Sequence, residues 1–261
     1  MRLNILRADP AGNITIFVLD PVAKEQRAEI ANKLMAIKEF EAEQVGFLTE
    51  PVNPECSCRL EMMGGEFCGN ASRALGLYLA QKSGKSGKML IEVSGSENAI
   101  EVTADIEKGE ATAQMPLPKK IEPFIFSGIE CTRVDLEGIS HLIAEVGTPD
   151  RRAVMAAENL FGDDDSIAAY GIMFFEKYTM EMIPFVKVKA TDSLVREGSC
   201  GSGTVAAAAS LCMGAVEGEF EYTVSQPSGS ITARVLKKDK KFVSVSIGGK
   251  VTLGEPTEVE I

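Results

Sequence analysis

Basic residues are in short supply in this 261-residue chain, which has 27 Lys and Arg against 38 Asp and Glu and a formal net charge of −11. Nucleic-acid binding depends on clustered Lys and Arg, and no basic stripe runs along the sequence. No apolar run approaches the roughly 20 residues that a membrane helix needs, and the first residues turn polar too early for a secretory signal. We therefore expect a cytoplasmic protein without a nucleic-acid or membrane partner.

Metal-ligand patterns and disulfide frameworks are also missing from the sequence. Six cysteines are scattered along the chain, without the dense spacing of small secreted domains. Cys56 and Cys58 form a C-x-C pair with no second ligand pair nearby, and there is no C-x-x-C motif. His141 is the only histidine. The sequence therefore predicts no metal site.

What the sequence does contain is a duplication, because its two halves match in four blocks that occur in the same order. The blocks pair residues 6–18 with 132–144, 43–48 with 170–175, 67–80 with 199–212, and 93–94 with 224–225. The offset drifts only from 126 to 132 residues, which is about half the chain. We interpret the chain as two copies of one α+β unit.

Each half is predicted to be a curled, mainly antiparallel sheet around a central apolar helix. The expected helices span residues 23–38, 71–82, 151–161 and 204–214. The fold class is thus α+β with two pseudo-symmetric domains.

The prolines and lysines of residues 115–124 predict a linker between the halves. We assign residues 1–118 to the N-terminal half and residues 119–250 to the C-terminal half. The C-terminal strand near 251–261 is a candidate to join the first half.

Both central helices follow a Cys-Gly dipeptide, Cys68–Gly69 and Cys200–Gly201. The first N–H groups of a helix have no partner inside it, and the helix dipole adds partial positive charge there. A substrate carboxylate fits against such N–H groups, and glycine permits its close approach. The same position stabilises a thiolate, so we expect the pKa of both thiols to be lowered.

Two cysteines at matched positions of a repeat indicate a two-base reaction. If the halves face each other about a pseudo-twofold axis, Cys68 and Cys200 reach one interdomain cleft from opposite sides. One thiolate can then remove an α-proton while the other thiol delivers a proton to the opposite face. This chemistry requires no cofactor. We predict Cys68 and Cys200 as the catalytic residues of an amino-acid racemase or epimerase.

The chain resembles the superfamily of diaminopimelate epimerase and proline racemase over nearly its whole length. The resemblance rests on AGN at 11–13, EQVGF at 43–47, FCGNA at 67–71, GISH at 138–141 and SCGSGT at 199–204. It implies a diaminopimelate epimerase-like fold of two α/β domains with the site between them, and catalysis by a cysteine pair without cofactor. The residues that it implies for substrate binding are Asn13, Gln44, Gly69, Asn70, Gly201 and Ser202. It also implies that His141 tunes the pKa of the cysteines.

Departures from this family pattern bear on the substrate. Diaminopimelate epimerases hold the distal end of their substrate with asparagines and a Glu-Arg pair, which would fall here near Met62, Ile139, Gly171 and 190–192. A charged distal group would therefore be buried without partners. Glu43 and Asp192 are instead candidates to hydrogen-bond an imidazole. LEMMGGEFCGNA and the V-x-x-T-D-S run with EGSCGSGT are similar to the histidine racemase branch, which interconverts L- and D-histidine.

Other functions stay open on the sequence alone. One is a diaminopimelate epimerase or another amino-acid epimerase. Another is a phenazine-biosynthesis-like isomerase, which the paired cysteines disfavour. A third is a non-catalytic thiol, zinc-binding or amino-acid-binding protein. The expected partner is a small amino-acid substrate, with a homodimer as an open alternative.

Overall fold

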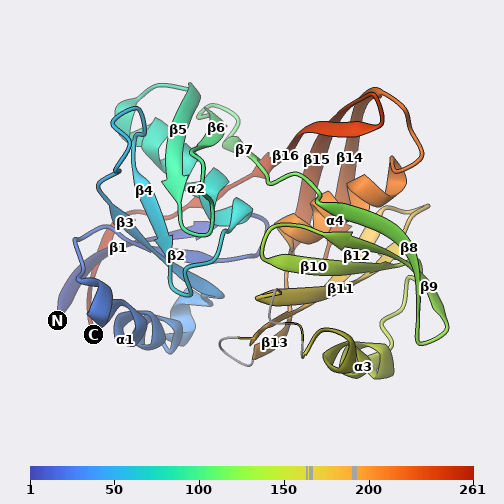
Figure 1. The fold of residues 1–261 in the computed structure, drawn as a ribbon. Coiled ribbons are helices and arrows are strands. Elements are labelled where there is room, and N and C mark those ends of the chain that lie inside the picture. Colours follow the sequence, from blue (N-terminus) through green and yellow to red (C-terminus); the bar gives the residue numbers. More distant parts are fainter. Residues whose placement is uncertain (163, 165–166, 190–192) are drawn as a thin grey trace. The chain divides into compact units, whose positions relative to one another are not determined.

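The computed structural model describes residues 1–162, 164, 167–189 and 193–261, and its chain divides into two compact units (Figure 1). Unit 1 comprises Met1–Gln114 and Gly248–Ile261, and unit 2 comprises Met115–Ile247. The chain thus passes into unit 2 four residues before the boundary expected after residue 118, and it returns to unit 1 three residues before the expected one.

The second half of the expected linker is a strand. Within 115–124, residues from Lys120 onward belong to β8 (Lys120–Phe126), which pairs antiparallel with β9 (Ile129–Asp135). Pro123 suggested a linker because proline has no backbone N–H. A strand nevertheless tolerates proline wherever no N–H is needed for the ladder.

Unit 1 begins with an antiparallel pair and continues with parallel and antiparallel neighbours in alternation. Its strands are β1 (Arg2–Asp9), β2 (Thr15–Val18), β3 (Gln44–Thr49), β4 (Arg59–Met62), β5 (Gly87–Val93), β6 (Ile100–Asp105), β7 (Glu110–Gln114), β17 (Thr252–Leu253) and β18 (Thr257–Glu260). β1 pairs antiparallel with β2, β17 and β18, so the C-terminal segment joins the first unit. β2 and β3 are parallel, β3 and β4 antiparallel, and β4 and β5 parallel.

Unit 2 repeats this order of pairing. Besides β8 and β9, it contains β10 (Ile139–Ala144), β11 (Ala169–Glu176), β12 (Glu181–Val188), β13 (Ser193–Arg196), β14 (Gly218–Gln226), β15 (Gly229–Lys238) and most of β16 (Lys241–Lys250). β9 and β10 are antiparallel, β10 and β11 parallel, β11 and β12 antiparallel, and β12 and β14 parallel. The sequence duplication is therefore a duplication of topology.

Side chains repeat along with the strands. Arg7 Nη2 lies 3.9 Å from Asp9 Oδ2 in β1, and Arg133 Nε lies 2.8 Å from Asp135 Oδ1 in β9. In each unit this ion pair lies on the strand that precedes the turn into the next antiparallel neighbour. The pairs are partly exposed, so their contribution to stability is modest. Their value is as markers that the alignment of the two halves is correct.

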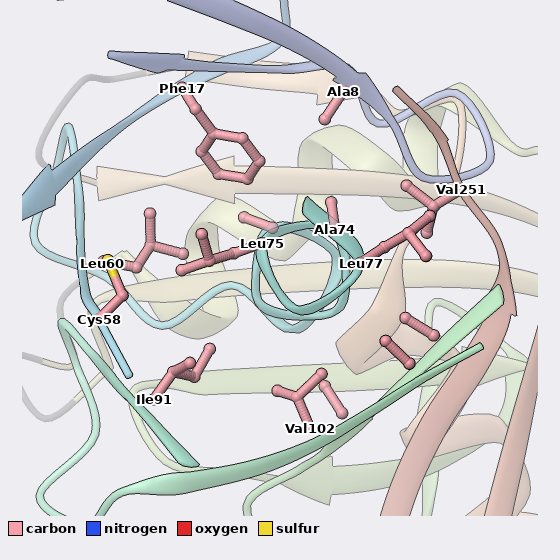
Figure 2. Packing of buried hydrophobic residues seen from close by; sticks show 14 of the residues in the cluster. Ala8, Phe17, Cys58, Leu60, Ala74, Leu75, Leu77, Ile91, Val102 and Val251 are labelled. Carbon is pink, nitrogen blue, oxygen red and sulfur yellow. The ribbon is translucent and has the colours of Figure 1, made fainter. Parts of the chain in front are cut away.

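The central helix of unit 1 is α2 (Gly69–Ser83), which packs against β5, β6 and β7 (Figure 2). Figure 2 shows Ala74, Leu75 and Leu77 of α2 surrounded by side chains of the strands, such as Phe17 and Val102. Burial of these apolar side chains is the main contribution to the stability of unit 1. α2 ends at Gly84, whose φ of +68° suits a helix terminus.

The corresponding helix of unit 2 is α4 (Gly201–Leu211), which packs against β15, β10, β11 and β9. Its run from Val205 to Ala209 is fully buried. Alanines at these positions allow the strands to approach the helix closely.

The helix predictions were correct in place, and all except that of α3 differ from the structure at the ends. The segment expected to be helical over 23–38 forms α1 (Lys24–Met35) followed by the 3-10 turn η1 (Lys38–Phe40). α3 (Arg151–Phe161) has the expected bounds. None of the helices in the described ranges combines the length and apolar character that a membrane span requires.

Candidate active site: two cysteine-capped helices

Cys68 and Cys200 are the N-cap residues of α2 and α4, with nearly identical backbone conformations. Ala71 N–H donates to Cys68 Sγ at 3.4 Å, and Gly203 N–H donates to Cys200 Sγ at 3.3 Å. Each helix therefore begins two or three residues earlier than expected, because the cysteine itself closes the first turn. Both sulfurs lie where the partial positive charge of a helix is concentrated.

In unit 1 the polar side chains predicted to bind substrate gather around Cys68. Gln44 Nε2 lies 3.3 Å from Cys68 Sγ and 2.9 Å from Asn13 Oδ1. Asn13 Nδ2 donates to Glu43 Oε2 at 2.7 Å, and Asn70 Nδ2 lies 3.3 Å from Asn13 Oδ1. These residues come from the β1–β2 turn, the start of β3 and the start of α2. The structure thus brings five of the predicted site residues into one cluster.

In unit 2 the cluster around Cys200 has a different composition. Ser202 Oγ lies 3.5 Å from Cys200 Sγ and 2.9 Å from His141 Nε2. The backbone N–H of Cys200 donates to Gln226 Oε1 at 2.7 Å, and Gln226 Nε2 donates to Thr204 Oγ1 at 3.0 Å. The predicted residues His141, Cys200 and Ser202 therefore form a continuous chain of polar contacts. Gly69 and Gly201 are the first residues of the two helices.

The expectation of a lowered thiol pKa is wrong for Cys200. Burial raises the pKa of the Cys200 thiol well above its usual range, and the nearby Glu197 carboxylate adds to the rise. The Ser202 hydroxyl and the Gly203 N–H act in the opposite direction but are outweighed. Loss of hydration on burial disfavours a thiolate more than the start of α4 favours it. The surroundings of Cys200 therefore favour the thiol over the thiolate.

His141 is fully buried, and burial lowers its pKa to about 3, with the charge of Asp135 acting weakly in the opposite direction. Within the described residues, no hydrogen-bond partner faces its Nδ1. A Cβ on Gly171 would lie 2.5 Å from this nitrogen, so the ring packs directly against the glycine. We assign the proton to Nε2, because an unpaired buried N–H is rarer than an unpaired acceptor. Neutral His141 then donates to Ser202 Oγ.

The low pKa of His141 predicts a pH-dependent stability. Between pH 6.5 and about 3 the unfolded chain binds a proton at His141 that the folded chain excludes, so the free energy of unfolding falls as pH falls. The loss is up to about 1.4 kcal/mol per pH unit. Urea unfolding between pH 7 and pH 5 should show a shallower pH dependence for His141→Gln than for wild type. Because the carboxylates are common to both proteins, parallel slopes would contradict the assignment.

One predicted site residue lies outside the described residues, and one residue that contacts Cys200 was not predicted. Asp192, predicted to contact the substrate, lies outside the described residues, as do the neighbouring positions 190 and 191. Gln226, which braces the backbone of Cys200, was missed. Its only signal was its place directly after the matched pair at 224–225.

Comparison with known proteins identifies the family. The family model described as the N-terminal domain of the histidine racemase CntK matches residues 2–256. The chain belongs to this family. A histidine racemase of Fusobacterium nucleatum subsp. nucleatum is 32% identical over 216 residues, which cover 78% of this chain and 79% of the relative. A histidine racemase of Staphylococcus aureus is 28% identical over 255 residues, covering 94% and 92%.

Solved structures agree with this family in fold. A hydroxyproline epimerase from Agrobacterium vitis, solved with bound trans-4-hydroxy-L-proline, superposes with a TM-score of 0.69 at 14% identity and covers 99% of this chain and 92% of that chain. The predicted α+β fold and the predicted histidine racemase branch are confirmed. Membership in the histidine racemase family makes the chain an amino-acid racemase, an isomerase in class.

Proposed function

We propose that this member of the histidine racemase family interconverts L- and D-histidine, with Cys68 and Cys200 as its two acid–base residues. The observation that carries the proposal is the matched pair of cysteine N-caps at the starts of α2 and α4. A thiol that caps a helix lies beside the N–H groups that attract a carboxylate. The α-carbon of an amino acid held by its carboxylate is then within reach of the sulfur.

The proposed reaction uses the starts of both central helices. The carboxylate of the substrate binds the helix starts at Gly69–Asn70 and Gly201–Ser202. One sulfur, as thiolate, takes the α-proton, and the negative charge that develops is spread toward the helix N-termini. The other sulfur, as thiol, returns a proton on the opposite face. The two cysteines thereby exchange protonation states, and the reverse reaction starts from the other form.

The imidazole of the substrate is proposed to lie against Glu43. This carboxylate accepts from Asn13 in the same cluster as Cys68, so it is close to the reacting atoms. A carboxylate accepts a hydrogen bond from an imidazole N–H and favours amino acids that carry such a group. Thiol chemistry of this kind suits the reducing cytoplasm, where we place the reaction.

Replacement of Glu43 by glutamine tests the specificity. Glutamine keeps an acceptor oxygen but loses the negative charge, and a charge-assisted hydrogen bond is worth about 1.4 kcal/mol more than a neutral one, so kcat/KM for histidine should fall about tenfold. Glu41→Gln is the matched control, since Glu41 is exposed and lies beside Arg7. Equal kcat/KM for the two variants would remove Glu43 from the substrate site.

The reaction itself is tested by incubating the enzyme with each L-amino acid in heavy water. Chiral chromatography and mass spectrometry should detect D-histidine that carries one deuterium at Cα. Deuterium uptake with another amino acid in preference to histidine would contradict the assignment of histidine as the substrate. Absence of uptake with all of them would overturn racemisation.

A further inference from the structure

Arg73 is a buried charged residue for which the proposed reaction has no role. It lies on α2, is 0% exposed and donates hydrogen bonds to three backbone carbonyls. These are Pro10 O at 2.9 Å, Gly249 O at 3.2 Å and Lys250 O at 2.9 Å. Its Nε also donates to Asn70 Oδ1 at 3.2 Å. A buried guanidinium is costly unless its donors are satisfied, and here they tie three segments of unit 1 together.

The contact with Asn70 fixes the direction of a chain of amides. Arginine can only donate, so Asn70 Oδ1 must face it and Asn70 Nδ2 must face Asn13 Oδ1, 3.3 Å away. At the other end, Glu43 as a carboxylate can only accept, so it receives Asn13 Nδ2. The orientations of both asparagine amides are therefore set from the two ends of the chain.

The orientation of these amides decides which groups face Cys68 Sγ. Because Asn13 presents its oxygen inward, Gln44 must present its NH₂ group, whose two hydrogens are shared among Thr15 Oγ1 at 2.8 Å, Asn13 Oδ1 at 2.9 Å and Cys68 Sγ at 3.3 Å. The sulfur thus faces the Gln44 amide and the Ala71 N–H, both donors that favour a thiolate. Asn13 Oδ1, 3.9 Å from the sulfur, is the acceptor when Cys68 is protonated.

The described residues of unit 2 show no counterpart of this arrangement. At the offset of 132 that relates Cys68 to Cys200, the residue that corresponds to Arg73 is Val205. Cys200 faces a serine hydroxyl and the charge of Glu197 instead. The two sulfurs therefore differ in environment although their backbones match.

We propose that Arg73 is a positioning residue that orients the amides around Cys68 and thereby maintains this cysteine as the thiolate of the resting enzyme, with Cys200 as the thiol. The proposal rests on the proposed two-cysteine function. It makes the ground state asymmetric, since the proton to be delivered starts on Cys200.

Charge supports the same conclusion. Burial lowers the pKa of Arg73 to about 10, so the side chain stays cationic near neutral pH, and the charges of Cys68 and Asp9 favour this cation. The attraction is mutual, so the Arg73 cation favours the Cys68 thiolate. The carboxylate of Glu43, on the segment before β3, accepts from Asn13, and its negative charge disfavours the Cys68 thiolate.

Alkylation of Cys68 measures its thiolate fraction without any need for turnover. Iodoacetamide labelling of the full-length enzyme, read at the Cys68 peptide by mass spectrometry from pH 5.5 to 9.5, gives a rate and a pH midpoint. In Arg73→Met the midpoint should rise by about one pH unit, so labelling below it slows about tenfold. Arg73→Lys, which keeps the charge, should recover part of the rate.

A buried cation of unit 2 provides the control. Lys237 is 1% exposed and donates to Cys212 O and Met213 O at the end of α4. Lys237→Met should lower stability and leave the midpoint of Cys68 unchanged. An unchanged midpoint in folded Arg73→Met, or an equal shift in Lys237→Met, would overturn the proposal.

A second variant covers the case in which Arg73→Met does not fold. Asn70→Ala breaks the amide chain while Arg73 keeps its three carbonyl partners, and it should also slow Cys68 labelling severalfold. A rate equal to wild type would overturn the proposal. If the heavy-water experiment finds no racemisation but both variants slow labelling, the proposed function fails while the role of Arg73 at the sulfur stands.

Discussion

Replacement of either Cys68 or Cys200 by serine is expected to reduce histidine racemisation by about 10³-fold. A serine hydroxyl is far less acidic than a thiol, so it neither holds the anionic form nor delivers a proton at neutral pH, and acid–base groups contribute 10²–10⁴ in rate. Serine is itself a strong helix N-cap. The fold should therefore survive, and the loss should appear in kcat rather than in the free energy of unfolding. Chiral chromatography of the product measures the rate.

Cys212→Ser is the matched control for this experiment, because Cys212 is buried at the opposite end of α4 from Cys200. It should keep wild-type turnover within about twofold, since conservative changes away from the reacting atoms have small effects. If both Cys68→Ser and Cys200→Ser retain more than about a tenth of wild-type turnover, two-base catalysis by these sulfurs is wrong.

The duplication was predictable because its most conspicuous residues carry backbone requirements. Gly12 and Gly138, aligned at an offset of 126, have φ of +86° and +72°, a conformation that favours glycine in both copies of the turn. The Cys-Gly dipeptides were predictable for a related reason, since a small residue after a cap marks the start of a helix. Such local requirements are visible in the sequence without knowledge of distant contacts.

What the sequence did not reveal depends on contacts between distant segments. Arg73 resembles an ordinary helix residue until the carbonyls of Pro10 and Gly249 are seen to surround it. The raised pKa of Cys200 follows from burial by segments far from it in sequence. The start of α2 was predicted two residues too late, because a cysteine was not considered as an N-cap.

The two copies differ in which of the two parallel strands carries the large polar side chain near the cysteine. In unit 1, Thr15 pairs with Gln44 across β2 and β3, and the amide of Gln44 reaches Cys68. At the same register in unit 2, His141 pairs with Gly171 across β10 and β11. The absent side chain of Gly171 leaves the space that the imidazole occupies. One topology thus supplies an amide to one sulfur and a histidine–serine pair to the other.

Gly95→Ala is expected to lower both the stability and the turnover of the enzyme strongly. Gly95 has φ of +72°, and a Cβ there would lie 2.3 Å from Phe67 N, the backbone directly before Cys68. A clash with backbone cannot be relieved by a rotamer change, so about 3 kcal/mol of stability should be lost. The remaining folded protein should turn over about a hundredfold more slowly, because a shift of about 1 Å near a reacting group has that cost.

Gly84→Ala separates this clash from the backbone conformation alone. Gly84 has φ of +68°, and a Cβ there meets no atom within 4 Å. Alanine at this position should therefore cost only about 1 kcal/mol, with turnover unchanged. Urea unfolding and racemisation, each normalised to the folded fraction, compare the two variants directly. If Gly95→Ala matched Gly84→Ala in both measurements, the turn after β5 would not brace the Cys68 segment, and the position of this sulfur would depend on α2 and the amide cluster alone.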